Sequence, residues 1–185
     1  MLESTAGRLL VATPLLGDPN FERTVILVCF HDANGAFGIV LNRPVGAPAA
    51  DLLPEWDGTI SPPGELHYGG PVERSSFLGL GYMEGPHDEG LEWWTPISHG
   101  VGLVNLASDT EEAGDLEALR IYHGYAGWGG GQLDAEIGEN SWFVVDLDPE
   151  DPFTERPERL WNDVLSRQRG EISMYGTYPV DPRVN

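Results

Sequence analysis

Two segments of this chain carry residue types that could bind an anion. Asn42 and Arg43 directly follow an apolar run typical of a strand, a place where scaffolds often present polar groups. The guanidinium of Arg43 could hold a carboxylate or a phosphate through two parallel hydrogen bonds. It could equally fix a loop by pairing with one of the many acidic residues, so both interpretations stay open.

The second segment, residues 123–131, contains His123, Gly124, Tyr125 and Trp128 among several glycines. A phosphate-binding P-loop requires Lys and then Ser or Thr after its last glycine, and two further glycines stand there instead. The dinucleotide pattern G-x-G-x-x-G is also missing. A helix is predicted next, so free amides at its start could hold an anion. We favour a packing role, in which glycines let the backbone and Trp128 approach closely.

These segments and a third glycine-rich turn could line one cleft at the ends of the predicted strands. The turn is H-Y-G-G-P-V, which contains Gly69 and Gly70. The hypothesis of a ligand-binding cleft therefore rests on eight residues: Asn42, Arg43, Gly69, Gly70, His123, Gly124, Tyr125 and Trp128. No catalytic residue can be assigned, since the chain has no G-x-S-x-G elbow.

The histidines show no metal-binding spacing. His31, His67, His87, His99 and His123 form no H-x-x-H or H-E-x-x-H pattern, and Cys29 is the only cysteine. We therefore expect neither a metal nor a cofactor. His31 and His123 each end an apolar strand and could meet at one sheet edge for acid–base work, although a polar strand end is the commoner role.

Gln132 and Glu136 lie four residues apart on the predicted helix. This spacing would let their side chains bond each other. Glu136 could act as a general base, but a solvated helical carboxylate is the favoured interpretation.

The charge of the chain argues against several classes of partner. Thirty acidic residues face ten basic ones, all arginine, which gives a net charge of −20. Such a surface repels phosphates. The densest arginine cluster, at residues 156, 159, 167 and 169, is diluted by Glu155 and Glu158. We therefore expect no direct contact with nucleic acid.

The segments expected of a secreted or membrane protein are missing from the sequence. The first residues form no basic region followed by an apolar one, and no apolar run approaches the roughly 20 residues of a membrane span. A single cysteine agrees with a reducing compartment. We expect a cytoplasmic protein that does not interact with membranes.

The pattern of apolar runs and turn residues predicts many strands and a few short helices. Asn34-Gly35 between two apolar runs favours a hairpin, and Ser108-x-x-Glu111 resembles a capping box. Strands are expected at 8–13, 24–31, 36–41, 66–68, 76–81, 101–106, 119–123 and 142–146, and helices at 49–53, from 108, after 131 and at 157–169. Residues 170–185 should form an edge strand or a tail. The prediction is one compact α+β domain, a largely antiparallel sheet or small barrel flanked by short helices.

Four motifs in order resemble the AlgH/YqgE family, also called UPF0301 or DUF179, and in particular its actinobacterial members. They are L-L-V-A-T-P-L-L-G-D-P-N-F-E-R-T-V, G-A-F-G-I-V-L-N-R-P-V, H-Y-G-G-P-V and G-Y-A-G-W-G-G-G-Q-L-D-A-E-I. The resemblance covers roughly residues 7 to 168. It implies a compact domain of α and β structure. Some members are described as transcriptional regulators on genetic association, and no enzymatic reaction comes with the family.

The sequence thus favours a cytoplasmic regulatory or interaction protein, without catalysis and without direct DNA binding. Its partner would be a protein or a small molecule that the sequence does not identify. The alternative is a small-molecule-binding protein or enzyme that uses the cleft proposed above.

Overall fold

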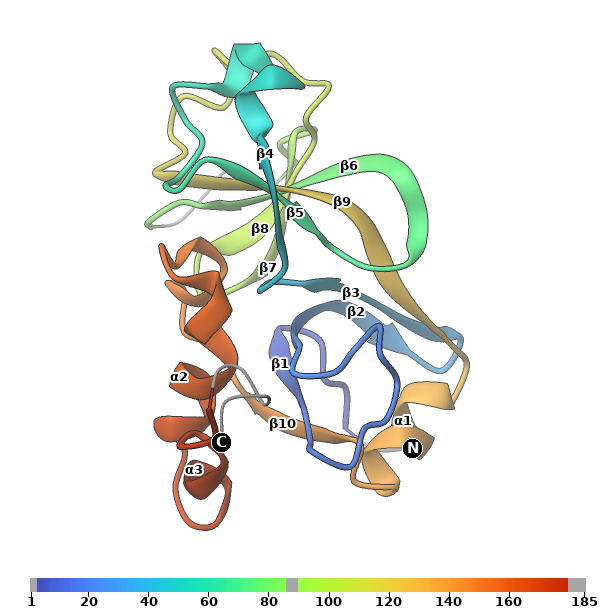
Figure 1. Ribbon diagram of the computed structural model, residues 1–185. Helices are drawn as coiled ribbons and strands as arrows, with labels where there is room; N and C mark the ends of the chain where they lie inside the picture. Colours follow the sequence, from blue (N-terminus) through green and yellow to red (C-terminus); the bar gives the residue numbers. More distant parts are fainter. Residues whose placement is uncertain (1–2, 86–89, 180–185) are drawn as a thin grey trace.

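The computed structural model describes residues 3–85 and 90–179 of the chain, which fold as strands with a few short helices (Figure 1). The strands are β1 (Arg8–Ala12), β2 (Val25–Asp32), β3 (Gly35–Val40), β4 (Pro44–Pro48), β5 (Glu65–Tyr68), β6 (Val72–Tyr82), β7 (Trp94–Ser98), β8 (Val101–Val104), β9 (Ala118–Gly129) and β10 (Trp142–Asp146). The α-helices are α1 (Gln132–Gly138), α2 (Leu160–Ser166) and α3 (Ile172–Tyr175). Short 3-10 turns are η1 (Ala49–Asp51), η2 (Pro54–Trp56), η3 (Asp151–Phe153) and η4 (Pro157–Arg159).

The strands form one curled sheet in the order β10-β1-β2-β3-β9-β6-β8-β7. Every pair along this path is antiparallel, while β5 joins β9 in parallel and carries β4 on its other side. β9 connects the two halves: its first part pairs with β6 and its last part with β3 (Figure 1). The expected α+β class, a single domain with a curled antiparallel half-barrel and few helices, is confirmed.

The hairpin of β2 and β3 forms at Asn34-Gly35, as the turn residues predict. Asp32 begins the turn, and its carboxylate accepts the amide of Asn34 at 2.7 Å. Residues 25–28 of β2 are completely buried, because both faces of this strand are covered. Such a strand has no solvated face, so its sequence is continuously apolar rather than alternating.

Apolar side chains of the sheet separate onto two faces by the alternation of strand residues. On one face Leu9 and Leu27 pack with Trp161 and Leu165 of α2. On the other face Ile26 packs with side chains that include Leu133 of α1, Trp128 and Trp142. A third cluster around Trp56 and Trp94 fills the other half of the molecule. None of the helices in residues 3–85 and 90–179 is long and apolar enough to cross a membrane.

The strand predicted to end at residue 123 continues through the glycine-rich segment, which forms the second half of β9. Gly124 has a φ of +70°, and a Cβ added there would lie 2.3 Å from the carbonyl oxygen of Gly70. A Cβ on Gly70, whose φ is +150°, would lie 2.1 Å from the carbonyl carbon of Tyr125. The glycines therefore permit the β5–β6 connection to lie directly on the backbone of β9, where strands with side chains could not meet.

Two strands were missing from the sequence prediction because prolines interrupt them. β4 begins and ends with a proline, and β7 contains Pro96 in its centre. Proline cannot donate to a strand ladder, so it occurs mainly in edge strands. β7 ends the sheet and β4 pairs only with β5 within the described residues, which explains how both tolerate proline.

Two other segments have a different secondary structure from the one predicted. The capping box does not begin a helix: the carboxylate of Asp109 accepts the amide of Glu111 at 2.9 Å and closes a local turn instead. The edge strand suggested for residues 170–185 is wrong for 172–175, which form the helical turn α3. Residues 180–185 lie outside the described part of the chain. The helices near residues 49, 132 and 160 occur as predicted, the first as 3-10 turns.

Gly70→Ala should destabilise the fold strongly, because its new methyl group would overlap the backbone of Tyr125. We expect the free energy of unfolding to fall by at least about 2 kcal/mol in urea denaturation. Gly58→Ala is the matched control, since a Cβ at Gly58 would meet nothing within 4 Å. Equal stability of the two variants would contradict this account of β9.

Candidate functional site

The eight residues predicted to bind a ligand are divided among several local contacts. Gly69 and Gly70 do lie against Gly124, as the cleft hypothesis requires. However, these contacts are between backbones: the amide of Gly69 donates to the carbonyl of His123, and its carbonyl accepts from Val40, both at 2.8 Å. The three glycines close the space between strands.

Asn42 and Arg43 hold the loop that precedes β2. The Asn42 amide group accepts from the backbone of Val25 and donates to the carbonyl of Arg23, each at 2.9 Å. The Arg43 guanidinium donates to the carbonyl of Glu22 at 2.8 Å. The loop-fixing interpretation therefore describes both side chains, although Arg43 bonds carbonyl groups and not a carboxylate.

The aromatic members of the predicted set face different neighbours. The His123 ring lies 3.1 Å from the Arg74 carbonyl oxygen, and Tyr125 packs on Phe37 with ring centroids 4.9 Å apart. Trp128 belongs to the buried cluster on the α1 face. None of the eight residues lines the cleft described below, and their role in ligand binding stays a prediction.

Glu136 is a structural acceptor for two indoles. One carboxylate oxygen accepts the ring N–H groups of Trp128 and Trp142, each at 2.9 Å. The other oxygen accepts from Gln132 at 3.0 Å, so the predicted pair on α1 is confirmed. Since one oxygen holds the two indoles and the other bonds Gln132, we assign Glu136 to the fold rather than to chemistry.

The two histidines expected at one sheet edge are separated. His31 of β2 lies opposite Ala36 of β3. His123 of β9 lies between Phe77 of β6 and Tyr68 of β5. The His31 ring contacts the Thr5 hydroxyl at 3.0 Å and the Asp134 carboxylate at 3.6 Å. Residues 3–85 and 90–179 contain no group of three His, Cys, Asp or Glu side chains that could hold a metal. His87 lies outside these residues.

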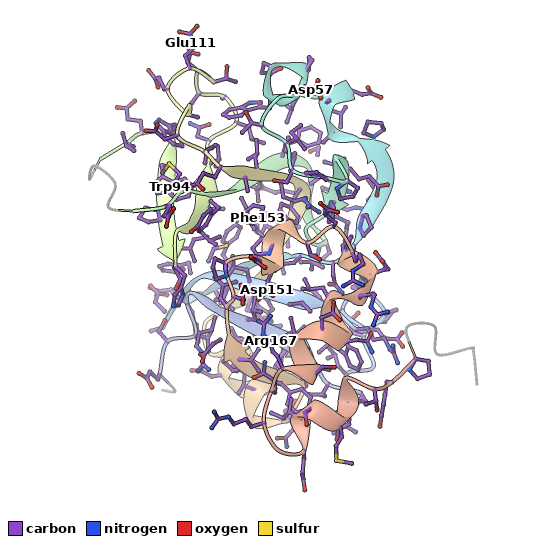
Figure 2. The ribbon with its side chains drawn as sticks, turned by 90° about the vertical axis from the view of Figure 1, so that its left-hand side faces the viewer. Asp57, Trp94, Glu111, Asp151, Phe153 and Arg167 are labelled. Carbon is purple, nitrogen blue, oxygen red and sulfur yellow. The ribbon has the colours of Figure 1, made fainter. Side chains whose placement is uncertain are left out.

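The structure contains a cleft that the sequence did not indicate. It has a volume of about 660 Å³ and lies where the ends of β6 and β9 meet the segment between β10 and α2. Figure 2 labels three of its residues one below another, from Phe153 near the middle of the molecule down to Asp151 and Arg167. Its lining consists of Tyr82, Glu117, Ala118, Asp148, Pro149, Glu150, Asp151, Phe153, Thr154, Glu155, Leu160, Asp163 and Arg167.

Arg167 and Asp151 form a bidentate ion pair in this cleft. Arg167 donates to both oxygens of the nearly buried Asp151, at 2.6 Å each. The hydrogen bond with Asp151 raises the pKa of Arg167, even though partial burial opposes the shift. The same guanidinium donates to the carbonyl of Asp146, and Asp151 also accepts the amide of Asp148. This pair fixes the segment after β10 against α2.

Four other carboxylates of the cleft, those of Glu117, Asp148, Glu150 and Glu155, have no ion pair with any described residue. All four residues are exposed. Tyr82, Phe153 and Leu160 line the same cleft. Sequence reasoning missed the cleft because acidic residues are so common in this chain that their spacing carried no information.

A buried cation lies behind one wall of the cleft. Arg120 is completely buried and donates to the carbonyl groups of Pro62, at 2.7 Å, and Thr154, at 3.2 Å. Its third contact is the ring of His67, where Nε2 lies 3.1 Å away and accepts. The Nε of Arg120 has no hydrogen bond to a described residue. Since Thr154 lines the cleft, Arg120 connects that wall to β5 and to the loop before it.

His67 is held neutral by this environment. Burial, followed by the charge of Arg120, lowers the pKa of His67 from 6.5 to about 4. With Nε2 accepting from Arg120, the ring proton is on Nδ1, which donates to the carbonyl of Glu65 at 3.0 Å. Protonation of Nε2 would remove the acceptor and place two cations side by side.

His67 should therefore make stability depend on pH. Its folded pKa lies below its unfolded value, so stability is complete above about pH 6.5 and falls as the pH decreases towards about 4. Across this window wild type should lose about 3 kcal/mol more than His67→Gln, whose amide oxygen can still accept from Arg120. Urea unfolding of both proteins at each pH measures the difference, and parallel losses would contradict it. Carboxylate titration is common to both proteins.

Comparisons with known proteins agree with this fold. Residues 9–173 match the family model DUF179, described as AlgH-like. A UPF0301 protein of Streptomyces coelicolor is 46% identical over 187 residues, covering 100% of this chain and 97% of its own length. A UPF0301 protein of Corynebacterium glutamicum is 35% identical, covering 99% and 98%.

Two solved structures are also similar. The crystal structure of protein DIP2367 from Corynebacterium diphtheriae has a TM-score of 0.87 at 31% identity, covering 96% of this chain and 94% of the other. The solution structure of AlgH from Pseudomonas aeruginosa has a TM-score of 0.67 at 29% identity, covering 97% and 98%. The family resemblance in the sequence is thereby confirmed, and the chain belongs to the AlgH-like family, DUF179 or UPF0301.

Proposed function

We propose that this protein is a non-catalytic, cytoplasmic binding protein whose acidic cleft takes a positively charged segment of a partner protein. The observation that carries the proposal is one cleft lined by four exposed carboxylates without ion pairs together with Tyr82, Phe153 and Leu160. A regulatory role, which the family resemblance implies, would act through this binding and not through DNA.

The electrostatics of the cleft favour a cation. A concave surface lined by one sign of charge concentrates ligands of the opposite sign. Six carboxylates and one guanidinium line the cleft. Even when the positive charge of the buried Arg120 is added, negative charges outnumber positive ones around the cleft. Tyr82 and Phe153 add aromatic rings, which attract Lys and Arg groups by cation–π interaction.

The residues of the cleft support binding more than catalysis. Among the described residues that line it there is no hydroxyl–imidazole or thiol–imidazole pair that could activate a nucleophile. The alternative site, at Asn42, Arg43 and the glycines, has less support because its polar groups already bond the loop before β2 and the neighbouring strands.

Neutralising the four exposed carboxylates of the cleft that lack an ion pair should weaken binding of a basic peptide. One variant combines the four substitutions Glu117→Gln, Asp148→Asn, Glu150→Gln and Glu155→Gln. We expect its affinity for a short Lys- and Arg-containing peptide to be about tenfold lower than that of wild type. Isothermal titration calorimetry at low ionic strength measures the affinity. Binding to wild type should weaken as salt is added.

A matched control separates the cleft from the charge of the whole protein. Glu55, Asp57, Glu111 and Glu112 are exposed acids outside the cleft lining. Figure 2 shows Asp57 and Glu111 at the opposite end of the molecule from Arg167. Neutralising these four residues should change the affinity by much less. An equal loss in both variants, or no loss in the cleft variant, would reject the cleft as the site.

Direct DNA binding can be tested separately. Two of the four clustered arginines are engaged with acids, Arg167 with Asp151 and Arg159 with Asp163 at 3.9 Å. With a net charge of −20, we expect no shift of duplex DNA by the isolated protein in an electrophoretic assay at physiological salt. A tight, sequence-selective shift would contradict this part of the proposal.

A further inference from the structure

β10 ends the sheet with one side of its backbone open. Within the described residues it pairs only with β1, with Val144 opposite Leu10 and Val145 opposite Leu9. In Figure 1, β1 lies on one side of β10 and no strand lies on the other. An edge of this kind presents N–H and C=O groups that can pair with another extended chain.

The hydrogen bonds around β1 show which groups of β10 are open. The amide of Thr13 donates to the Ser141 carbonyl, whereas the amide of Ala12 donates away from β10, to Thr24. Bonded and non-bonded pairs alternate along an antiparallel ladder. Phe143 and Val145 therefore bond β1, and the amide and carbonyl of Val144 point outwards.

No described residue accepts from or donates to the outward groups of Val144. The next outward carbonyl along β10, that of Asp146, accepts from Arg167 at 3.2 Å. Arg167 also lines the acidic cleft. The open edge therefore leads to the cleft at its Asp146 end.

Unlike the other edge strands, β10 has no proline that would prevent another strand from pairing with it. Prolines interrupt both β4 and β7, and they prevent continuous pairing with another chain. β10 has the sequence W-F-V-V-D, which contains no proline. Both of its faces are covered, since Phe143 packs on Tyr175 and Val144 packs against the cluster of Trp128. Its backbone edge is the part that remains for a partner.

We propose that the β10 edge accepts an extended, basic segment of a partner protein by strand addition. Backbone hydrogen bonds to Val144 would hold the segment, and its Lys or Arg side chains would reach the carboxylates beyond Asp146. The basic character of the segment rests on the proposed function of the cleft, whereas the strand addition rests on β10 alone. A second copy of this chain is a poorer occupant, because two molecules of net charge −20 repel each other.

Hydrogen exchange followed by NMR tests the edge directly. In the free protein, the amide of Val144 should exchange faster than those of Phe143 and Val145. A short peptide of alternating Lys and Val residues should then slow exchange at Val144 by at least about tenfold when it saturates the protein. The same peptide with alternate amides methylated cannot complete the ladder and should give no protection.

Two variants separate strand addition from charge. Val144→Pro removes the outward amide and should weaken binding of the Lys–Val peptide by about tenfold, while Val144→Thr should bind as wild type does. If Val144→Pro does not fold, the methylated peptide supplies the same comparison. Slow exchange at Val144 in the free protein, or equal binding of both peptides, overturns the inference.

The outcomes distinguish this inference from the proposed function. Loss of binding in the cleft variant alone, with no protection of Val144, supports the cleft and rejects strand addition. Protection of Val144 that survives neutralisation of the cleft supports strand addition and rejects the cleft. Peptide-independent dimerisation that protects Val144 would assign the edge to a second copy and overturn the proposed occupant.

Discussion

The bend of β9 is the constraint on which the other parts of this structure depend. A single strand pairs with β6 over its first part and with β3 over its last part, and it curves from one half of the sheet to the other (Figure 1). In this strand Gly124 meets Gly70 at a separation that leaves no room for a Cβ. Because the two halves of the sheet share β9, the position of one half fixes the other.

Several buried polar contacts are arranged along this strand. Arg120 holds the loop at Pro62 and the cleft wall at Thr154, and the hydroxyl of Tyr122 donates to the carbonyl of Pro152 at 3.2 Å. At the far end, Trp128 meets the carboxylate of Glu136. β9 thus connects the acidic cleft at its start to the aromatic cluster under α1 at its end. A buried guanidinium without a carboxylate partner is costly, and its three acceptors offset part of that cost.

The sequence predicted the fold where local signals agree with the tertiary structure. Asn34-Gly35 specified the hairpin, and the four-residue spacing of Gln132 and Glu136 predicted their contact on α1. It failed where tertiary position overrides local preference, as at the prolines of the two edge strands β4 and β7. The packing role favoured for the glycines after residue 123 fits Gly124. The sequence nevertheless ended the strand at residue 123, because a glycine needed for close approach of two strands has the same signature in one sequence as a glycine needed for a turn.

The site was harder to predict than the fold for a physical reason. Polar residues beside strand ends, such as Asn42 and Arg43, suggested binding, yet their hydrogen bonds are used by the loop before β2. The cleft instead gathers acids from Glu117 to Asp163, which only the folded chain brings together. What distinguishes them from the other acids is their position around one cleft, a property that a linear sequence does not contain.

NMR chemical-shift mapping with a basic peptide tests the central claim most directly, because it reports every contacted residue at once. The account predicts that the largest changes occur at Tyr82, Phe153, Glu155 and Arg167, around the acidic cleft. Changes centred instead on Arg43, Gly70 and Tyr125 would contradict it and would place the binding site among the residues that the sequence first suggested.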